Sequence, residues 1–370
     1  VYTSTDKQIL NFGQDSSFAG NLTAQGNQDD NEIGDFYYDV PDGFLALCTS
    51  NLSDPEIADP TAHHTTVLYS GNSAAQTITT GFPPGLIWWA YRDAAAQRHK
   101  VVDSVRMEGV SAGSTLLVDS TDDSAEQTST ENINVLTSTG YTLLDGDANG
   151  SGNTFVSWNW KAGGDAVTND DGTIESEVSA NTDAGFSIVT YTGTEVQGDT
   201  VGHGLSQKPE LVFTKNLETI FNWVVSTGNV TGTLNQYLVL NSDAAANTNQ
   251  YYWDNTNPGA STIQFWNSAA TNQSETAMLA YCFHSVEGYS KIGTYEGNGA
   301  LDGTFVYTGF RPAFVMTKSI DSTSDWQMFD NKRAGYNVDN YEIEANDGAV
   351  EDTSTEFIDI VSNGFKNRDT

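Results

Sequence analysis

Residues 188–193 read IVTYTG, and two similar stretches follow the same pattern, TVLYSG at 66–71 and IGTYEG at 292–297. Each stretch is followed by a turn rich in Gly and Pro and then by an apolar run, LIWW at 86–89, LVFT at 211–214 and FVMT at 314–317. Three copies in the same order are the signature of a tandem array. The sequence therefore predicts one module that occurs three times.

The composition of these stretches predicts strands. Runs rich in Val, Ile, Thr, Tyr, Phe and Trp recur about every 8 to 15 residues between Gly, Asn, Asp and Ser. Residues 154–160, TFVSWNW, alternate large and small side chains, which predicts a half-buried strand. In Gly81-Phe82-Pro83-Pro84 and Gly309-Phe310-Arg311-Pro312 the Pro lacks a donor and belongs just before a strand. We predict an all-β fold of tandem antiparallel β-sandwich repeats of jelly-roll type.

The repeats predict the domain organisation. Residues 1–60 are read as the end of a preceding β-sandwich unit, in which residues 43–48 form a closing strand like those expected at 154–160 and 276–283. The predicted units are 61–164 for the first repeat, 165–184 for a linker or extra hairpin, 185–286 for the second repeat and 287–370 for the third repeat. By the same comparison, the third repeat is expected to continue past Thr370 to a closing strand. The Asp-x-x-Arg of Asp103 and Arg106 recurs at Asp330 and Arg333.

The charge restricts the partners. Among 370 residues there are 49 acidic side chains against 15 Lys and Arg, a formal net charge of -34. Such a surface repels phosphate backbones and anionic headgroups, so neither nucleic acid nor a membrane surface is an expected partner. No run approaches the roughly 20 apolar residues that cross a bilayer, and no membrane insertion is predicted.

One acidic turn has features of a calcium loop. Asp145, Asp147 and Asn149 place oxygen atoms at alternate positions before Gly150, as a calcium loop does. The twelfth position is Val156 where a bidentate Glu is needed, so a helix-loop-helix site is excluded. Two interpretations stay open, an acidic hairpin turn and a weakly held calcium ion. No other cofactor is predicted.

Cysteine and histidine indicate no reactive centre. Cys48 and Cys282 fall in equivalent expected strands of different units, so we predict two buried free thiols and no disulfide. His63 and His64 adjoin Pro60 in an expected linker, which predicts a solvated pair. The sequence contains no P-loop or HExxH motif. Because repetition also favours binding or spacing modules over catalysis, we predict a protein that is not an enzyme.

Aromatic side chains are the candidates for carbohydrate binding, since rings stack on pyranose faces while amides take the hydroxyl groups. Tyr251, Tyr252, Trp253 and Asn255 form the candidate site, because three consecutive rings cannot all face inward. Trp88 and Trp89 lie in an apolar run and are read as core residues.

Several motifs together resemble a known family. The Gly-Phe-x-Pro before an apolar strand, the stretch FVSWNWKAGG at 155–164, VGHGL at 201–205 and SNGF at 362–365 resemble a repeated domain of unknown function from virion proteins of tailed bacteriophages, especially marine ones. Residues 11–48 resemble the end of the concanavalin-like domain that often precedes such repeats. The resemblance implies a place in the virion, in a tail fibre or another host-facing appendage, and supplies no catalytic residues.

From these observations we expect a phage fibre or adhesin whose repeats project toward the host and bind surface glycan through loops. Expected partners are other copies of the chain in a homotrimer, other virion proteins and the glycan. Three alternatives remain: a capsid decoration or head-fibre protein, a tailspike enzyme that degrades polysaccharide, and a bacterial extracellular adhesin.

Overall fold

The structure is a computed structural model, and it describes residues 2–368 apart from 5–6, 52–54, 96, 112, 131, 334–336 and 338–340. The chain divides into two compact units, Val1–Pro55 and Glu56–Thr370. The described residues of the first unit include the antiparallel pair β1 (Tyr2–Ser4) and β2 (Lys7–Ile9) and the short helix η1 (Thr49–Asn51). None of the helices in the described part of the chain is both long and apolar enough to span a membrane.

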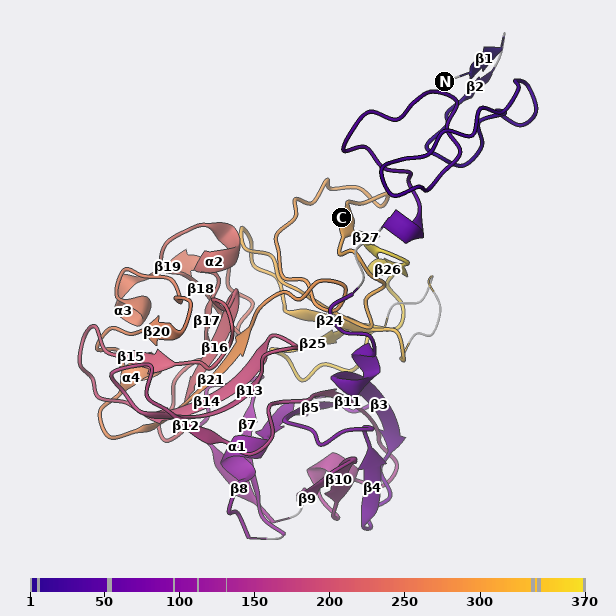
Figure 1. Cartoon of the computed structure of the whole chain (residues 1–370). Helices are drawn as coiled ribbons and strands as arrows, with labels where there is room; N and C mark the ends of the chain where they lie inside the picture. Colours follow the sequence, from indigo (N-terminus) through magenta and orange to yellow (C-terminus); the bar gives the residue numbers. More distant parts are fainter. Residues whose placement is uncertain are drawn as a thin grey trace. The chain divides into compact units, whose positions relative to one another are not determined.

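The first repeat is a two-sheet sandwich (Figure 1). Its larger sheet has the order β3-β11-β5-β6-β7-β8, with β3 (His64–Ser70), β5 (Leu86–Tyr91), β6 (Lys100–Asp103), β7 (Thr115–Asp119), β8 (Gln127–Ser129) and β11 (Thr154–Trp160). The smaller sheet contains β4 (Gln76–Thr79), β10 (Gly140–Leu143) and β9 (Ile133–Thr137). Short helical turns connect them: η2 (Pro60–Ala62), α1 (Ser104–Met107) and η3 (Asp147–Asn149). A core that includes Trp89, Tyr141 and Phe155 lies between the two sheets.

The second repeat has the same plan with a wider sheet. The order is β12-β13-β14-β21-β16-β17-β18-β19, with β12 (Val167–Asn169), β13 (Ser176–Asn181), β14 (Phe186–Thr192), β16 (Leu211–Asn216), β17 (Val224–Ser226), β18 (Gln236–Val239), β19 (Asn247–Thr248) and β21 (Ala277–Phe283). The facing pair is β15 (Thr200–Gly202) with β20 (Thr262–Gln264), and the helical turns are α2 (Gly228–Thr231), α3 (Gln250–Trp253) and α4 (Ala269–Asn272). Residues 165–184 supply the hairpin β12–β13, which widens this sheet.

The third repeat has two three-stranded sheets. One is β23 (Phe314–Thr317), β24 (Gln327–Asp330) and β25 (Ile343–Glu344), and the other is β22 (Phe305–Tyr307), β27 (Gly364–Asn367) and β26 (Ile358–Val361). Gly81 before β5 and Gly309 before β23 both have φ of 90°, a left-handed conformation that explains the Gly of the shared Gly-Phe-x-Pro turn. The prediction of an all-β fold with antiparallel, sandwich-like sheets is confirmed.

The three repeats contact one another in a closed ring. The amide of Glu126 donates to the carbonyl of Leu217 (2.7 Å), which joins the first repeat to the second. Ala246 donates to Ile320 (2.9 Å), joining the second to the third, and Glu351 donates to Arg92 (3.1 Å), joining the third to the first. Two tryptophan indoles also join neighbouring repeats. The indole of Trp223 donates to the Asp119 carbonyl (2.7 Å), and that of Trp326 donates to the Val239 carbonyl (2.9 Å). The repeats are therefore arranged with pseudo-threefold symmetry.

One shared core fills the middle of this ring. It takes Trp88 and Trp158 from the first repeat, Phe213 and Tyr281 from the second, and Met328 with other residues from the third. Each large sheet therefore buries both faces, one in its own sandwich and one in the ring. The expectation of a half-buried strand at 154–160 is therefore wrong, because residues 155–159 of β11 are all buried. The three repeats therefore pack together as one unit and not as separate domains.

Side chains of the central strands β11 and β21 form buried polar contacts with a neighbouring repeat. The indole of Trp158 donates to Asp330 Oδ2 (3.0 Å), and the Tyr281 hydroxyl donates to Asp103 Oδ2 (2.7 Å). Each Asp caps a turn and pairs with the Arg three residues on, Arg106 at 2.5 Å and Arg333 at 2.6 Å. The repeated Asp-x-x-Arg is thus a joint between repeats, which its spacing alone did not reveal.

Two strand predictions are wrong. Residues 43–48 contain no strand, and neither do residues 292–297, the counterpart of β3 and β14. In the first two repeats that outer strand pairs with the closing strand β11 or β21. No strand of the described residues takes the place of a closing strand beside β23, so residues 292–297 have no ladder to join.

Candidate functional site

The predicted carbohydrate site forms a single helical turn, α3, in the second repeat. The side chain of Asn249 accepts a hydrogen bond from the Tyr251 amide (3.0 Å) and so caps the turn, and Asp254 ends it with φ of 44°. Successive side chains on a helix point about 100° apart. Tyr251 and Trp253 therefore face opposite ways, the first to solvent and the second to the core.

The four predicted residues differ in their exposure to solvent. Tyr251 is 52% exposed, whereas Trp253 is 1% exposed and packs against Phe265 in the core of the second repeat. A ring with so little accessible surface cannot stack on a sugar, so the assignment of Trp253 to the site is corrected. Tyr252 is half-buried with its ring edge on Tyr237 at 4.9 Å, and Asn255 accepts a hydrogen bond from Asn235 (3.2 Å).

A fifth residue, missed from the sequence, completes the aromatic face. Trp266 lies half-buried with its ring 5.5 Å from that of Tyr251, in an edge-to-face arrangement. Asp254 lies beside them and accepts hydrogen bonds from Gln197 (2.9 Å) and Gln264 (2.7 Å). We define the aromatic face as Tyr251, Tyr252 and Trp266. Only the tertiary structure brings Trp266 to Tyr251, because fourteen intervening residues carry no pattern that connects them.

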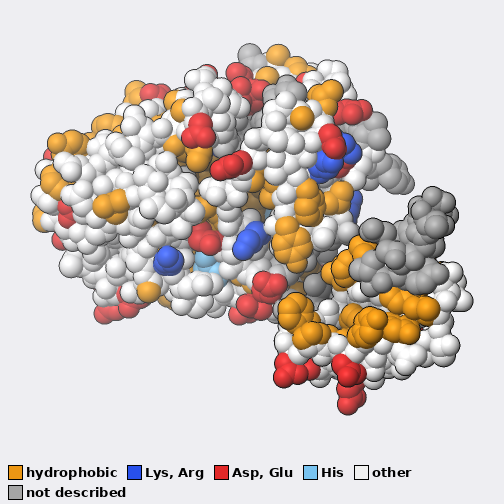
Figure 2. Space-filling model, turned by 90° about the horizontal axis from the view of Figure 1, so that it is seen from above, with side chains coloured by type: hydrophobic (Ala, Val, Ile, Leu, Met, Phe, Trp, Pro, Cys, Tyr) orange, Lys and Arg blue, Asp and Glu red, His pale blue; other side chains and the backbone are white. Residues whose placement is uncertain are grey.

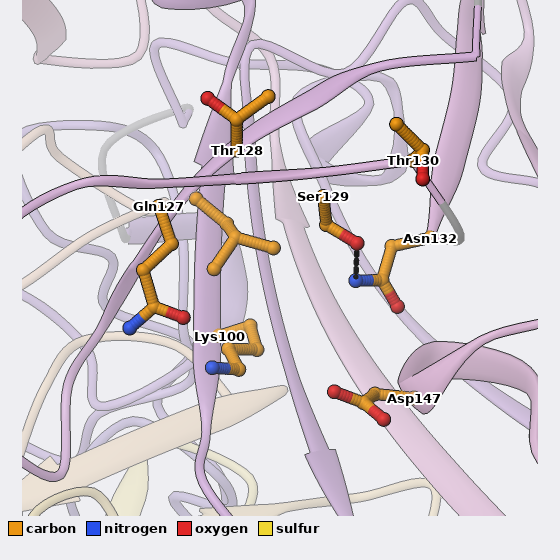
Figure 3. A pocket seen from close by; sticks show the side chains of 8 residues that line it. Lys100, Gln127, Thr128, Ser129, Thr130, Asn132 and Asp147 are labelled. Atoms are coloured by element: carbon orange, nitrogen blue, oxygen red, sulfur yellow. Dashed lines mark hydrogen bonds between the residues drawn. The ribbon is translucent and has the colours of Figure 1, made fainter.

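A second candidate is a polar pocket of about 320 Å³ in the first repeat (Figure 3). Its lining is mostly neutral and hydrogen-bonding, with Lys100, Leu117, Gln127, Thr128, Ser129, Thr130, Asn132 and Asp147 around it. The ammonium of Lys100 is paired with the carboxylate of Asp119, which also accepts from Gln127 (3.1 Å). Asn132 is held by a bond to Ser129 (2.8 Å). The donors and acceptors suit a small neutral polyhydroxyl compound.

Of the three predicted calcium ligands only Asp147 lines this pocket. Asp145 and Asp147 are exposed, while Asn149 is buried and its amide is already used. Its Oδ1 accepts from the Asn72 amide (3.0 Å), and its Nδ2 donates to the carbonyls of Ala74 (2.6 Å) and Leu144 (2.8 Å). The described residues contain no group of three or more His, Cys, Asp or Glu that could hold a metal. The calcium site stays a prediction, and these contacts favour the hairpin-turn interpretation.

The structure corrects two smaller predictions. Cys282 is a buried free thiol as expected, but Cys48 is exposed. His64 begins β3 and packs on Trp160 and Phe314, with ring centroids 4.9 and 5.8 Å away, so it is not a solvated linker residue. Burial lowers the pKa of His64 to about 4.

Glu342 is expected to make the free energy of unfolding depend on pH. It is 6% exposed, and burial together with nearby carboxylates, first Glu344, raises its pKa to about 7 from 4.5. The folded state therefore binds this proton more tightly than the unfolded state, and stability falls as pH rises from about 4.5 through 7. We expect Glu342→Gln to raise the free energy of unfolding at pH 8 by about 1–3 kcal/mol and to change it little at pH 4.

Urea unfolding at the two pH values measures this effect. The matched control is Glu195→Gln, at an exposed position, which should leave the pH dependence as it is in the parent protein. A Glu342→Gln protein whose stability declines between pH 4.5 and 7 as steeply as that of the parent would contradict the assignment.

Comparison with known proteins adds a family and no activity. The model of a family described as a domain of unknown function, DUF7483, matches residues 59–370. No curated protein and no solved structure matches the chain.

Proposed function

The chain belongs to the DUF7483 family, whose function is unknown, and we propose that it is a non-enzymatic structural protein of a bacteriophage virion, located in a tail fibre or another host-facing appendage. The observation that carries this proposal is the closed ring of three repeats around a shared core. One chain thereby forms a rigid pseudo-trimeric body whose polar clusters join sheets together. An appendage needs such rigidity more than it needs chemistry.

The surface agrees with an exposed role. Carboxylate side chains are spread over the face in Figure 2, and Lys and Arg are sparse there. With a formal net charge of -34, the chain repels nucleic acid and anionic membranes, and the proposal includes neither as a partner. Its proposed partners are other virion proteins and further copies of itself in a homotrimer.

The location is tested by labelling purified particles with an antibody to residues 56–370 and imaging them. Label on the tail or its fibres supports the proposal. Label confined to the capsid favours the decoration or head-fibre alternative, and label only on uninfected bacteria favours an extracellular adhesin. The tailspike alternative is tested by incubating the protein with host polysaccharide, where new reducing ends would contradict a non-enzymatic role.

We further propose that the aromatic face binds host surface glycan. Tyr251→Ala and Trp266→Ala each remove a ring that would stack on a sugar, and we expect each to weaken glycan-array binding about 10-fold, equivalent to about 1.4 kcal/mol. The matched control is Tyr307→Ala in the third repeat, which removes a ring that is 58% exposed and should leave binding unchanged. Equal binding by all three folded variants would contradict this site.

A further inference from the structure

The first two repeats are each completed by a closing strand that the described part of the third repeat does not have. β11 lies between β3 and β5, and β21 lies between β14 and β16, pairing along the full length of both neighbours. β23 is the counterpart of β5 and β16, and it pairs with β24 on one edge only. Within the described residues no strand pairs with its other edge.

The backbone of β23 has hydrogen-bonding groups directed to that open edge. Asn331 donates to the carbonyl of Ala313 (3.0 Å), which places residues 313, 315 and 317 in the bonded positions toward β24. The N–H and C=O groups of Phe314 and Met316 therefore point away from β24. Both side chains are only half-buried, whereas all six residues of the counterpart β5 are buried. An edge in this state is a template for a further strand.

The ring leaves a matching gap. The central side chain of β11, Trp158, reaches Asp330 in the third repeat, and that of β21, Tyr281, reaches Asp103 in the first. The pairing register makes Thr227 of the second repeat the counterpart of these two aspartates. Thr227 is buried and receives no such side chain from the described third repeat. One of three equivalent joints is therefore unfilled.

We propose that the open edge of β23 receives a closing strand from the same polypeptide, reached from β27 by a loop like those from β10 to β11 and from β20 to β21. The two existing closing strands define its pattern. Large apolar side chains, as in Leu279, Tyr281 and Phe283, face the ring core. Smaller ones such as Ala280 and Ser157 alternate with them and face the sandwich. Because Thr227 carries no charge, the central side chain is neutral.

The test extends the full chain after Thr370 with a copy of residues 265–283, which contain the loop and β21. We expect amide exchange at Phe314 and Met316 to slow at least about 100-fold in the extended chain, because a paired amide exchanges only after local opening. We also expect a higher melting temperature and the same oligomeric state as the parent chain. A matched extension carrying Leu279→Asp and Tyr281→Asp in the copied strand should neither slow this exchange nor raise the melting temperature.

Met316→Pro removes one donor from the open edge and spares the bonds between β23 and β24. It should leave the unextended chain folded and abolish the gain in the extended one. Exchange at Phe314 and Met316 that is unchanged by the extension would overturn the proposal. So would a parent chain that is dimeric, with both amides protected until dilution, since the strand would then come from a second copy.

Discussion

Replacing Arg333 by Met is expected to destabilise the Glu56–Thr370 unit by about 3–5 kcal/mol, because it leaves the buried Asp330 carboxylate without its cation. Arg333 pairs with Asp330 (2.6 Å) and Glu351 (3.1 Å), and its Nη2 also donates to the Met328 carbonyl (2.9 Å). The side chains of Arg333 and Asp330 are both inaccessible to solvent. Burial alone would raise the pKa of Asp330, but the guanidinium overcomes this effect and holds the pKa below its ordinary value.

Urea unfolding at pH 7 measures the loss. Arg368→Met is the control, because that guanidinium is 36% exposed and pairs with Asp359 at the surface, where an ion pair contributes less than about 1 kcal/mol. The double variant Arg333→Met with Asp330→Asn should recover part of the loss, since it removes the isolated charge. Equal effects of Arg333→Met and Arg368→Met would show that the cluster does not hold the ring together.

Trp158→Ala is expected to cost about 3–5 kcal/mol and to lower the stability of all three repeats together. The indole lies in the shared core, donates to Asp330, and has the Arg333 guanidinium 5.3 Å from the centre of its ring. Because one core contains side chains from every repeat, we expect a single calorimetric transition for Glu56–Thr370 in both the parent and the variant.

Trp158→Phe separates the two contributions of this residue. It keeps much of the ring volume and loses the hydrogen bond to the buried carboxylate, so a smaller loss of about 1–3 kcal/mol is expected. Two resolved transitions, of which only the one from the first repeat moves in Trp158→Ala, would contradict a shared core.

The fold class was predictable because it depends on local pattern. Alternating and apolar runs at 66–70, 86–89, 188–192 and 211–214 lie in strands, and the Pro residues precede β5, β16 and β23 as expected. The same reasoning failed at 292–297, where a matching sequence forms no strand. A strand needs a hydrogen-bonding neighbour, and the neighbour that pairs with β3 and β14 has no counterpart among the described residues of the third repeat.

The candidate site was predicted only in part, and the reason is local conformation. Three consecutive rings cannot share one environment, and Tyr251 is exposed as expected. The sequence pattern does not identify which ring is buried, because that depends on the helical turn set by Asn249 and Asp254. Trp266 joins Tyr251 through chain folding beyond the reach of any motif.

By itself the sequence determined that the chain builds antiparallel sheets and repeats one module, since side-chain alternation and turn residues act over a few neighbours. Tertiary structure alone decided that the modules close into a ring, that Asp103 and Asp330 are joints between them, and that each large sheet is buried on both faces. These features depend on contacts between residues about 75 or more positions apart. The free energy of such contacts is set by geometry that no local pattern encodes.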